Sequence, residues 1–169
     1  MVTIHRAVLF LHKYNMKHII IDTNVVNNDH FLQNTMIKIL VESKGQLNHK
    51  LYMPMVVVDE MAKHYKEAVD DNVSKATQAL SELNKLCGTR LDVDYTDCNK
   101  EIGKYKDKLL SILKMRDIDV LPYPKTDHEK LVSKDLAGKK PFKDKGKGYR
   151  DALIWESVLD FCKNLEGDR

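Results

Sequence analysis

The sequence has few cysteines and no long hydrophobic run, and each shortage excludes a class of protein. The three cysteines, Cys87, Cys98 and Cys162, are an odd number, and none lies in a CxxC pair or at a spacing typical of zinc ligands. We therefore expect them to be reduced and buried. No segment approaches the ~20 apolar residues that a membrane-spanning helix needs, and the apolar run from Ala7 to Leu11 is too short for a signal peptide. The expected location is the cytoplasm.

The composition is that of one soluble globular domain with a local excess of positive charge. Its 169 residues fit a single domain, and the hydrophobic fraction of 43% and charged fraction of 31% exclude disordered and fibrous proteins. The net charge of +3 is too small to indicate nucleic-acid binding by itself. A basic run nevertheless stands against only two acids late in the chain: Lys134, Lys139, Lys140, Lys143, Lys145, Lys147 and Arg150. This run is either a solvated loop or a phosphate-binding patch.

Strand and helix patterns alternate from Met16 onward, and we interpret residues 1–15 as a dispensable extension before a domain over 16–169. The uniformly apolar run Ile19–Ile21 and the valine-rich run Leu51–Val58 are expected to be strands buried on both faces. The remaining patterns predict helices over 29–45 with Asp29 as N-cap, 59–88 (one helix or two), 97–116, 127–138 and 150–165, and a short strand over 118–121. This alternation predicts an α/β fold in which a parallel sheet has helices on both faces.

Three acidic residues are predicted to meet at one edge of this sheet, the edge where ligands bind in such folds. Asp22 ends the first strand and Glu60 begins the helix after the second, so both lie at the carboxyl edge. Asp151 opens the final helix in line with its apolar stripe from Ile154 to Leu165, so its side chain is expected to point at the sheet. Taken singly, Asp22 also suits a turn, and the other two acids suit the dipole of a first helical turn.

Placing like charges together at a half-buried edge costs free energy unless a cation is bound there. A divalent metal ion is the simplest cation that would lower this cost. Oxygen ligands without His or Cys pairs favour Mg²⁺ or Mn²⁺ over zinc. Such a metal lowers the pKa of a bound water and stabilises charge on a phosphoryl oxygen, which is the chemistry of phosphodiester hydrolysis. Because the basic run ends beside Asp151, we expect it to hold a polyanionic backbone near the metal through Lys140, Lys143, Lys145, Lys147 and Arg150.

Three segments of the chain resemble the acidic motifs of PIN-domain nucleases. They are IIIDTNV at 19–25, PMVVVDEM at 54–61 and GYRDALIW at 148–155. The first motif alone is weak, whereas the three in order, with the long third signature, are more specific. The resemblance covers the chain from Met16 to its C-terminus, while residues 88–140 resemble little in the family beyond the place of an insertion.

The resemblance implies a three-layer α/β/α sandwich with a central parallel sheet. It also implies an endoribonuclease that uses Mg²⁺ or Mn²⁺ to hydrolyse phosphodiester bonds of RNA, with single-stranded RNA as the expected substrate, and without a covalent intermediate. Carried over by motif, Asp22, Glu60 and Asp151 are the catalytic residues and metal ligands.

The resemblance also implies supporting roles for the neighbours of these acids. Thr23 and Asn24 are expected to orient the first acid or a water, and Arg150 to contact phosphate. Asp59 is the rival of Glu60 as the second ligand. Glu60 is preferred because the acid of the family motif precedes an apolar residue in the helix, as Glu60 does here.

Two alternatives and one departure from the family pattern accompany this hypothesis. A haloacid-dehalogenase-type phosphatase needs a second Asp two positions after the first, and Asn24 occupies that position. A catalytically weak or inactive PIN-like module that binds RNA or a protein is the second alternative. PIN nucleases commonly continue with a strand and a further acid after the final helix, and here only a short polar segment follows Leu165. We therefore expect the last strand to be missing, activity to be weak, and a homodimer or an inhibitory protein partner to cover the exposed edge.

Overall fold

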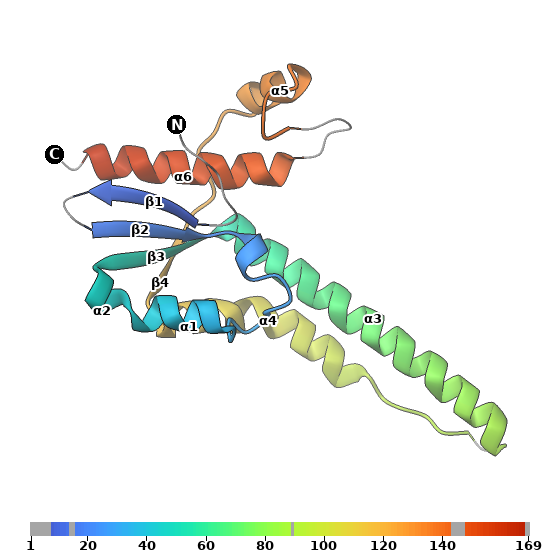
Figure 1. Ribbon diagram of the computed structural model, residues 1–169. Helices are drawn as coiled ribbons and strands as arrows, with labels where there is room; N and C mark the ends of the chain where they lie inside the picture. Colours follow the sequence, from blue (N-terminus) through green and yellow to red (C-terminus); the bar gives the residue numbers. More distant parts are fainter. Residues whose placement is uncertain (1–7, 14–15, 89, 143–147, 168–169) are drawn as a thin grey trace.

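A computed structural model describes residues 8–13, 16–88, 90–142 and 148–167, and it contains a four-stranded sheet (Figure 1). The strands lie in chain order across the sheet: β1 (Val8–Lys13), β2 (Met16–Ile21), β3 (His49–Pro54) and β4 (Ile118–Leu121). β2, β3 and β4 are parallel, as predicted, whereas β1 pairs antiparallel with β2. The sequence did not indicate β1, and whether the residues before Met16 are dispensable stays a prediction.

Within the described ranges, no helix has the length and apolar character needed to cross a membrane.

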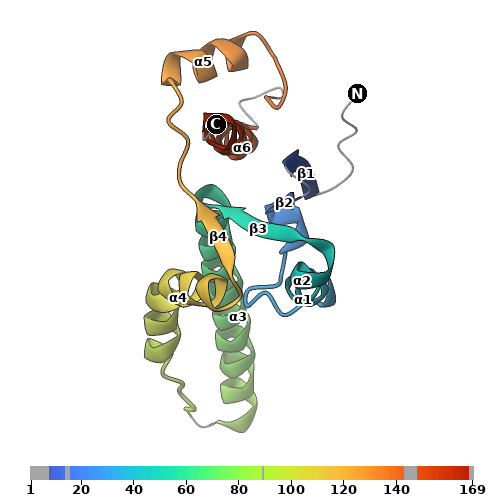
Figure 2. The same ribbon diagram turned by 90° about the vertical axis from the view of Figure 1, so that its left-hand side faces the viewer.

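Helices cover both faces of the sheet and give the three predicted layers (Figure 2). They are η1 (Thr23–Val25), α1 (Thr35–Glu42), α2 (Lys44–Leu47), α3 (Met55–Cys87), α4 (Thr96–Met115), α5 (His128–Leu136) and α6 (Tyr149–Gly167). Ile19 and Ile21 of β2 belong to the main core with residues of α1, α3 and α4. Ile20, between them, packs with Val158 of α6 on the opposite face, because successive strand side chains point to opposite sides. All three isoleucines are buried, which confirms that β2 is covered on both faces.

The second strand is shorter than the apolar run Leu51–Val58 indicated. β3 ends at Pro54, and Met55 begins α3, so the valines Val56–Val58 form the first turns of a helix. All three valines are buried, and this burial outweighs a strand preference that spans only ~1 kcal/mol among residue types. Glu60 therefore lies in the second turn of α3 and not at its first residue.

The loop before α1 is ordered by Asp29, but Asp29 does not cap that helix, which corrects the prediction. The N-cap is Asn34, whose side-chain oxygen accepts a hydrogen bond from Ile37 N at 2.8 Å. The Asp29 carboxylate instead accepts from Gln33 N at 2.6 Å and from Asn34 N at 2.8 Å. Asp29 thus holds the turn that leads into α1.

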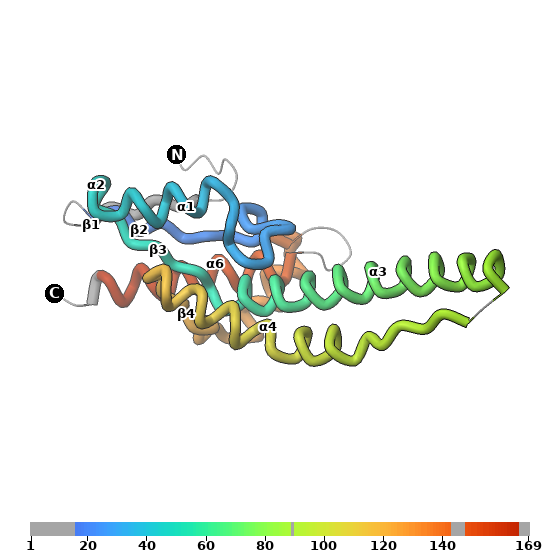
Figure 3. The backbone as a smooth tube through the Cα atoms, turned by 90° about the horizontal axis from the view of Figure 1, so that it is seen from below, coloured from blue at the N-terminus to red at the C-terminus, as the bar shows by residue number. Residues whose placement is uncertain are grey.

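α3 is one helix of 33 residues, and its second half extends beyond the sheet together with the segment that leads back to α4 (Figures 1 and 3). The buried residues of α3, Val56–Val58 and Met61, all lie in its first two turns. Farther along, its surface carries ion pairs one turn apart, such as Lys66 Nζ to Asp70 Oδ2 at 2.5 Å. The helix ends at Gly88, whose φ of +64° is the left-handed conformation common after a helix. We call residues 66–88 and 90–96 the arm.

The segment over residues 88–140, interpreted as an insertion, supplies part of the core and of the sheet. α4 contributes Tyr105, Leu109 and Leu113 to the main core, and β4 pairs with β3. α5 lies on the outer side of α6 (Figure 2), where Leu131 forms a small core with Phe142 and Ala152. Whether relatives lack this segment stays a prediction.

None of the three cysteines, which all lie in the described ranges, forms a disulfide. The expectation that they are buried is wrong. Cys87 is exposed at the end of α3, and Cys98 and Cys162 are only partly buried.

Candidate active site

Asp22 lies directly after β2, at the edge where the parallel strands end. Its backbone is extended, with φ −98° and ψ 161°, and its carboxylate caps η1. Asp22 Oδ1 accepts a hydrogen bond from Thr23 N at 2.8 Å, and Oδ2 accepts one from Asn24 Nδ2 at 2.9 Å. Both carboxylate oxygens are therefore held in place by the two residues that follow Asp22 in the chain.

Glu60 of α3 is joined to this segment by the Thr23 hydroxyl. Thr23 Oγ1 donates to Glu60 Oε2 at 2.6 Å, across 37 positions of sequence. The Glu60 side chain is 12% exposed, and its other oxygen, Oε1, pairs with Arg150 Nη1 from the first turn of α6. The beginnings of η1, α3 and α6 thus meet at the carboxyl edge of the sheet (Figure 1).

Asp151 is exposed, which corrects the expectation that it points at the sheet. The apolar stripe does face the sheet farther along α6, where Val158 and Phe161 pack with Ile20 and Tyr52. Asp151 lies in the first turn of the helix, before this contact begins. Among the described residues, no three His, Cys, Asp or Glu side chains form a group able to hold a metal ion. Convergence of all three acids on one metal therefore stays a prediction.

The donor atoms at this edge fit a hard divalent cation in chemical type. Asp22 and Glu60 offer carboxylate oxygens, and oxygen ligands are those that Mg²⁺ and Mn²⁺ prefer. The edge also attracts positive charge, because the Arg150 guanidinium already contacts Glu60. Asp22 and Glu60 are thus able to hold such an ion, and Asp151, next to Arg150 in the chain, is the available third acid.

Asp59 has different partners from its neighbour Glu60. Its carboxylate pairs with Lys106 Nζ of α4 at 2.5 Å and accepts a hydrogen bond from the Tyr123 hydroxyl. Burial opposes ionisation of Asp59, but the hydrogen bonds from Lys106 and Tyr123 and the Lys106 charge outweigh it, so the pKa of Asp59 is lowered. The hydrogen bond to Asp59, followed by burial, raises the pKa of Tyr123 to about 12. Glu60 is therefore the acid of this pair that is linked to Asp22.

Backbone carbonyls of the loop between η1 and α1 are held by Tyr105 of α4 and by Arg116, the residue that follows α4. The Tyr105 hydroxyl donates to His30 O at 2.6 Å, and Arg116 Nη1 donates to Leu32 O. Leu32 is fully buried with a φ of +57°, an uncommon conformation for a leucine. Fixing this loop also fixes the path of the chain just after Asp22.

The basic run divides into engaged and exposed residues. Lys134 Nζ pairs with Glu156 Oε1 at 2.6 Å, and Arg150 pairs with Glu60. Lys140 is exposed. The other three lysines predicted to bind nucleic acid, Lys143, Lys145 and Lys147, lie outside the described residues. Phosphate binding by this run stays a prediction.

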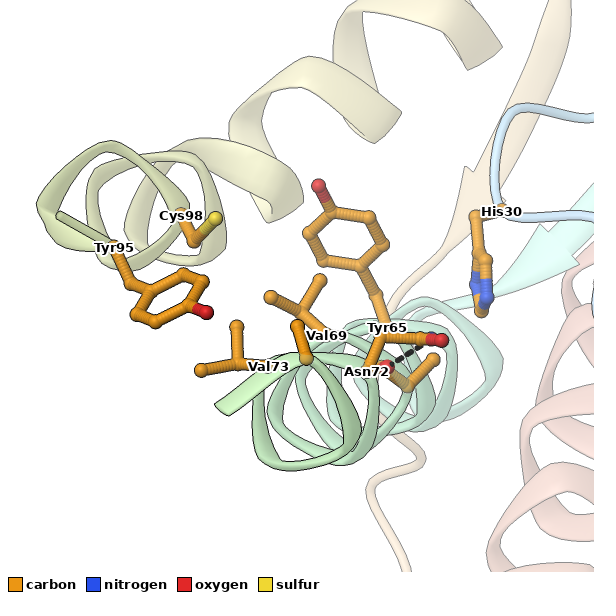
Figure 4. Close-up of a pocket in the computed structure, with 9 residues that line it drawn as sticks. His30, Tyr65, Val69, Asn72, Val73, Tyr95 and Cys98 are labelled. Atoms are coloured by element: carbon orange, nitrogen blue, oxygen red, sulfur yellow. Dashed lines mark hydrogen bonds between the residues drawn. The ribbon is translucent and has the colours of Figure 1, made fainter. Parts of the chain in front are cut away.

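A separate apolar groove of about 420 Å³ runs between α3 and α4 (Figure 4). Its α3 side includes Tyr65 and the apolar residues Ala68, Val69, Val73 and Ala76, and Asn72 there donates to Ala68 O at 2.7 Å. His30, Tyr95 and Cys98 complete the lining. The described lining includes none of the predicted site residues, so the groove is distinct from the edge where Asp22 and Glu60 meet.

The sequence did not predict which cations pair with Asp59 and Glu60. Lys106 pairs with Asp59, and Arg150 pairs with Glu60. Arg150 and Glu60 lie 90 positions apart, and no local pattern reports such a contact. A usable signal was present in α3 itself, because adjacent helical residues point about 100° apart. Asp59 and Glu60 therefore had to face different elements and to find different partners.

Comparison with known families agrees with this geometry. The profile described as PIN domain matches residues 19–168, a range that includes Asp22, Glu60 and Asp151 together with the end of β2 and all of β3, β4 and α6. No curated protein and no solved structure gives a significant match. Because the profile covers nearly the whole chain and the fold has the predicted layers, this protein belongs to the PIN-domain family.

Proposed function

We propose that this protein is a ribonuclease that uses Mg²⁺ or Mn²⁺ to hydrolyse internal phosphodiester bonds of single-stranded RNA. PIN domains are generally nucleases, which gives the class of reaction. The observation that carries the proposal is the link between Asp22 and Glu60 through the Thr23 hydroxyl at the carboxyl edge of the sheet. Two partly buried carboxylates that supply only oxygen ligands favour a hard divalent cation at this place.

The residues at this edge have distinct roles in the proposed reaction. Asp22 and Glu60 hold the cation, with Asp151 as the third ligand, and Thr23 and Asn24 keep the first two carboxylates in position. A bound Mg²⁺ or Mn²⁺ neutralises charge on a phosphoryl oxygen and lowers the pKa of a coordinated water. The exposed Lys140 and the lysines that follow it bind the RNA backbone beside the cation.

Cleavage of a labelled single-stranded RNA tests the proposal. We expect cleavage with Mn²⁺, none with EDTA, and a loss of roughly 100-fold or more in Asp22→Asn and Glu60→Gln, the size typical of losing one group that stabilises transition-state charge. Asp70→Asn is the matched control, because Asp70 is an exposed acid of the arm paired only with Lys66 in the described structure. Cleavage that survives EDTA, or that Asp22→Asn leaves intact, would contradict the proposal.

A PIN module that binds RNA without cleaving it is the second candidate. It is favoured by the Arg150 contact that neutralises Glu60 and by the lack of a three-acid group among the described residues. The same assay separates the two functions. Retention of the RNA on the protein with Mn²⁺ present, without any product, would favour the binding module.

A further inference from the structure

Both oxygens of the Glu60 carboxylate are occupied, and only one of the two partners is neutral. Oε2 accepts from the Thr23 hydroxyl at 2.6 Å, and Oε1 contacts the Arg150 guanidinium. The Glu60 side chain is 12% exposed, whereas that of Arg150 is 55% exposed. The arginine therefore reaches from the surface to cover a largely buried negative charge.

A divalent cation on Glu60 and the guanidinium compete for the same charge. A carboxylate removed from water needs a cation or strong donors nearby, and either partner meets that need. A guanidinium repels a second cation on the same carboxylate, so each partner weakens the binding of the other. Binding of a metal ion to Glu60 therefore weakens the contact of Arg150 with Oε1 and favours its release.

We propose that Arg150 is a positioning residue that holds Glu60 in the metal-free protein and leaves it when Mg²⁺ or Mn²⁺ binds. Its guanidinium then turns to a phosphate of the substrate, for which its planar donors are well suited. This inference rests on the proposed function, since it takes Glu60 as a metal ligand. It adds an order of events, in which the metal ion releases the residue that contacts RNA.

The local structure allows the side chain to move without disturbing the fold. Half of the Arg150 side chain is already exposed. The backbone at the start of α6 is anchored separately, because Ala152 is buried and its N–H donates to Gly148 O at 2.8 Å. Rotation of the guanidinium away from Glu60 therefore breaks the Arg150–Glu60 ion pair, while Ala152 keeps the first turn of α6 in place.

Mn²⁺ binding to the full chain, measured by electron paramagnetic resonance, tests the competition. Arg150→Gln should bind Mn²⁺ roughly 3- to 10-fold more tightly than the wild type, because no ion pair has to be broken. Lys106→Gln is the matched control. It removes a cation from Asp59, the adjacent acid on α3, without touching Glu60, and should change Mn²⁺ affinity by less than about twofold. An Arg150→Gln affinity equal to or weaker than that of the control would overturn the proposal.

A second measurement uses the wild type and does not depend on how well the variants fold. The side-chain Nε–H signal of Arg150 in an NMR spectrum, assigned by its loss in Arg150→Gln, should move when Mg²⁺ is added and stay in place with EDTA. A signal that does not respond to saturating Mg²⁺ would show that Arg150 stays paired with Glu60.

Asp22→Asn distinguishes a failure of the proposed metal site from a failure of the proposed displacement of Arg150. If Mn²⁺ binds equally well without the Asp22 carboxylate, the proposed metal site is wrong as well; if it binds only with Asp22 while Arg150 stays in place, the displacement alone is wrong.

Discussion

Gly148 sets the start of α6 and with it the place of Arg150. Its φ of +109° favours glycine, and a Cβ built there would lie 2.8 Å from the Pro141 carbonyl carbon and overlap the attached oxygen. We expect Gly148→Ala to lower the free energy of unfolding by about 2 kcal/mol. Gly103 is the matched control, because it lies inside α4 with open space around its Cβ position, so Gly103→Ala should raise that free energy by ~0.5–1 kcal/mol. Urea unfolding of both variants measures the two changes, and shifts of the same sign would contradict this account.

The attachment of α5 to α6 depends on Glu156, a buried acid that the sequence analysis did not single out. Its carboxylate contacts Lys134 at 2.6 Å, Lys130 at 3.8 Å and the Thr126 hydroxyl at 3.2 Å. Burial opposes ionisation, but the hydrogen bond and charge of Lys134, the charge of Lys130 and the hydrogen bond from Thr126 outweigh it, so the pKa of Glu156 lies below its usual 4.5. A lowered pKa means that this contribution to stability is complete above about pH 4.5 and disappears as the pH falls through the folded-state value.

Glu156→Gln tests this contribution at the level of the two helices. At pH 7 the variant should lose about 2 kcal/mol of unfolding free energy, since it keeps the shape of the side chain but leaves Lys134 without its counter-charge. The difference from the wild type should shrink as the pH is lowered toward 3. Glu101→Gln, an exposed acid 3.9 Å from Lys108, should change stability by less than about 0.5 kcal/mol. Urea unfolding at several pH values decides, and a Glu156→Gln effect that stays constant with pH would argue against the ion-pair explanation.

The whole molecule divides into a packed body and an exposed arm. The buried residues of α3 lie at 56–61, and from Lys66 to Cys87 its side chains are exposed or only partly buried. Local openings are expected to be frequent where few apolar contacts hold a helix. Amide hydrogens at 75–87 should therefore exchange roughly 100-fold or more faster than those at 56–62, and those at 105–113 of α4 should be protected like the latter. Hydrogen exchange followed by mass spectrometry measures this, and uniform protection along α3 would mean that the arm is stabilised by contacts not evident in its burial.

The sequence by itself determined the elements whose patterns are local. Ile19–Ile21 reads as a strand covered on both faces, 118–121 as a short strand and 97–116 as a helix, because hydrophobic period and length are properties of a few neighbouring residues. The three acidic motifs indicated the PIN-domain family for the same reason, since each motif is a short segment. Asp22 and Glu60 were expected at the carboxyl edge of the sheet, and they lie there.

Tertiary structure decided what depends on distant parts of the chain. Val56–Val58 have strand preferences, yet they form the start of α3 because the helix buries them in the main core. Asp151 is spaced in line with the apolar stripe of α6, but it precedes Ile154, the first residue of the stripe that packs on the core, and it remains exposed. The pairing of Glu60 with Arg150 joins residues 90 positions apart. Such a contact follows from the path of the whole chain and from the need of a buried carboxylate for a counter-charge, and no spacing within the sequence encodes it.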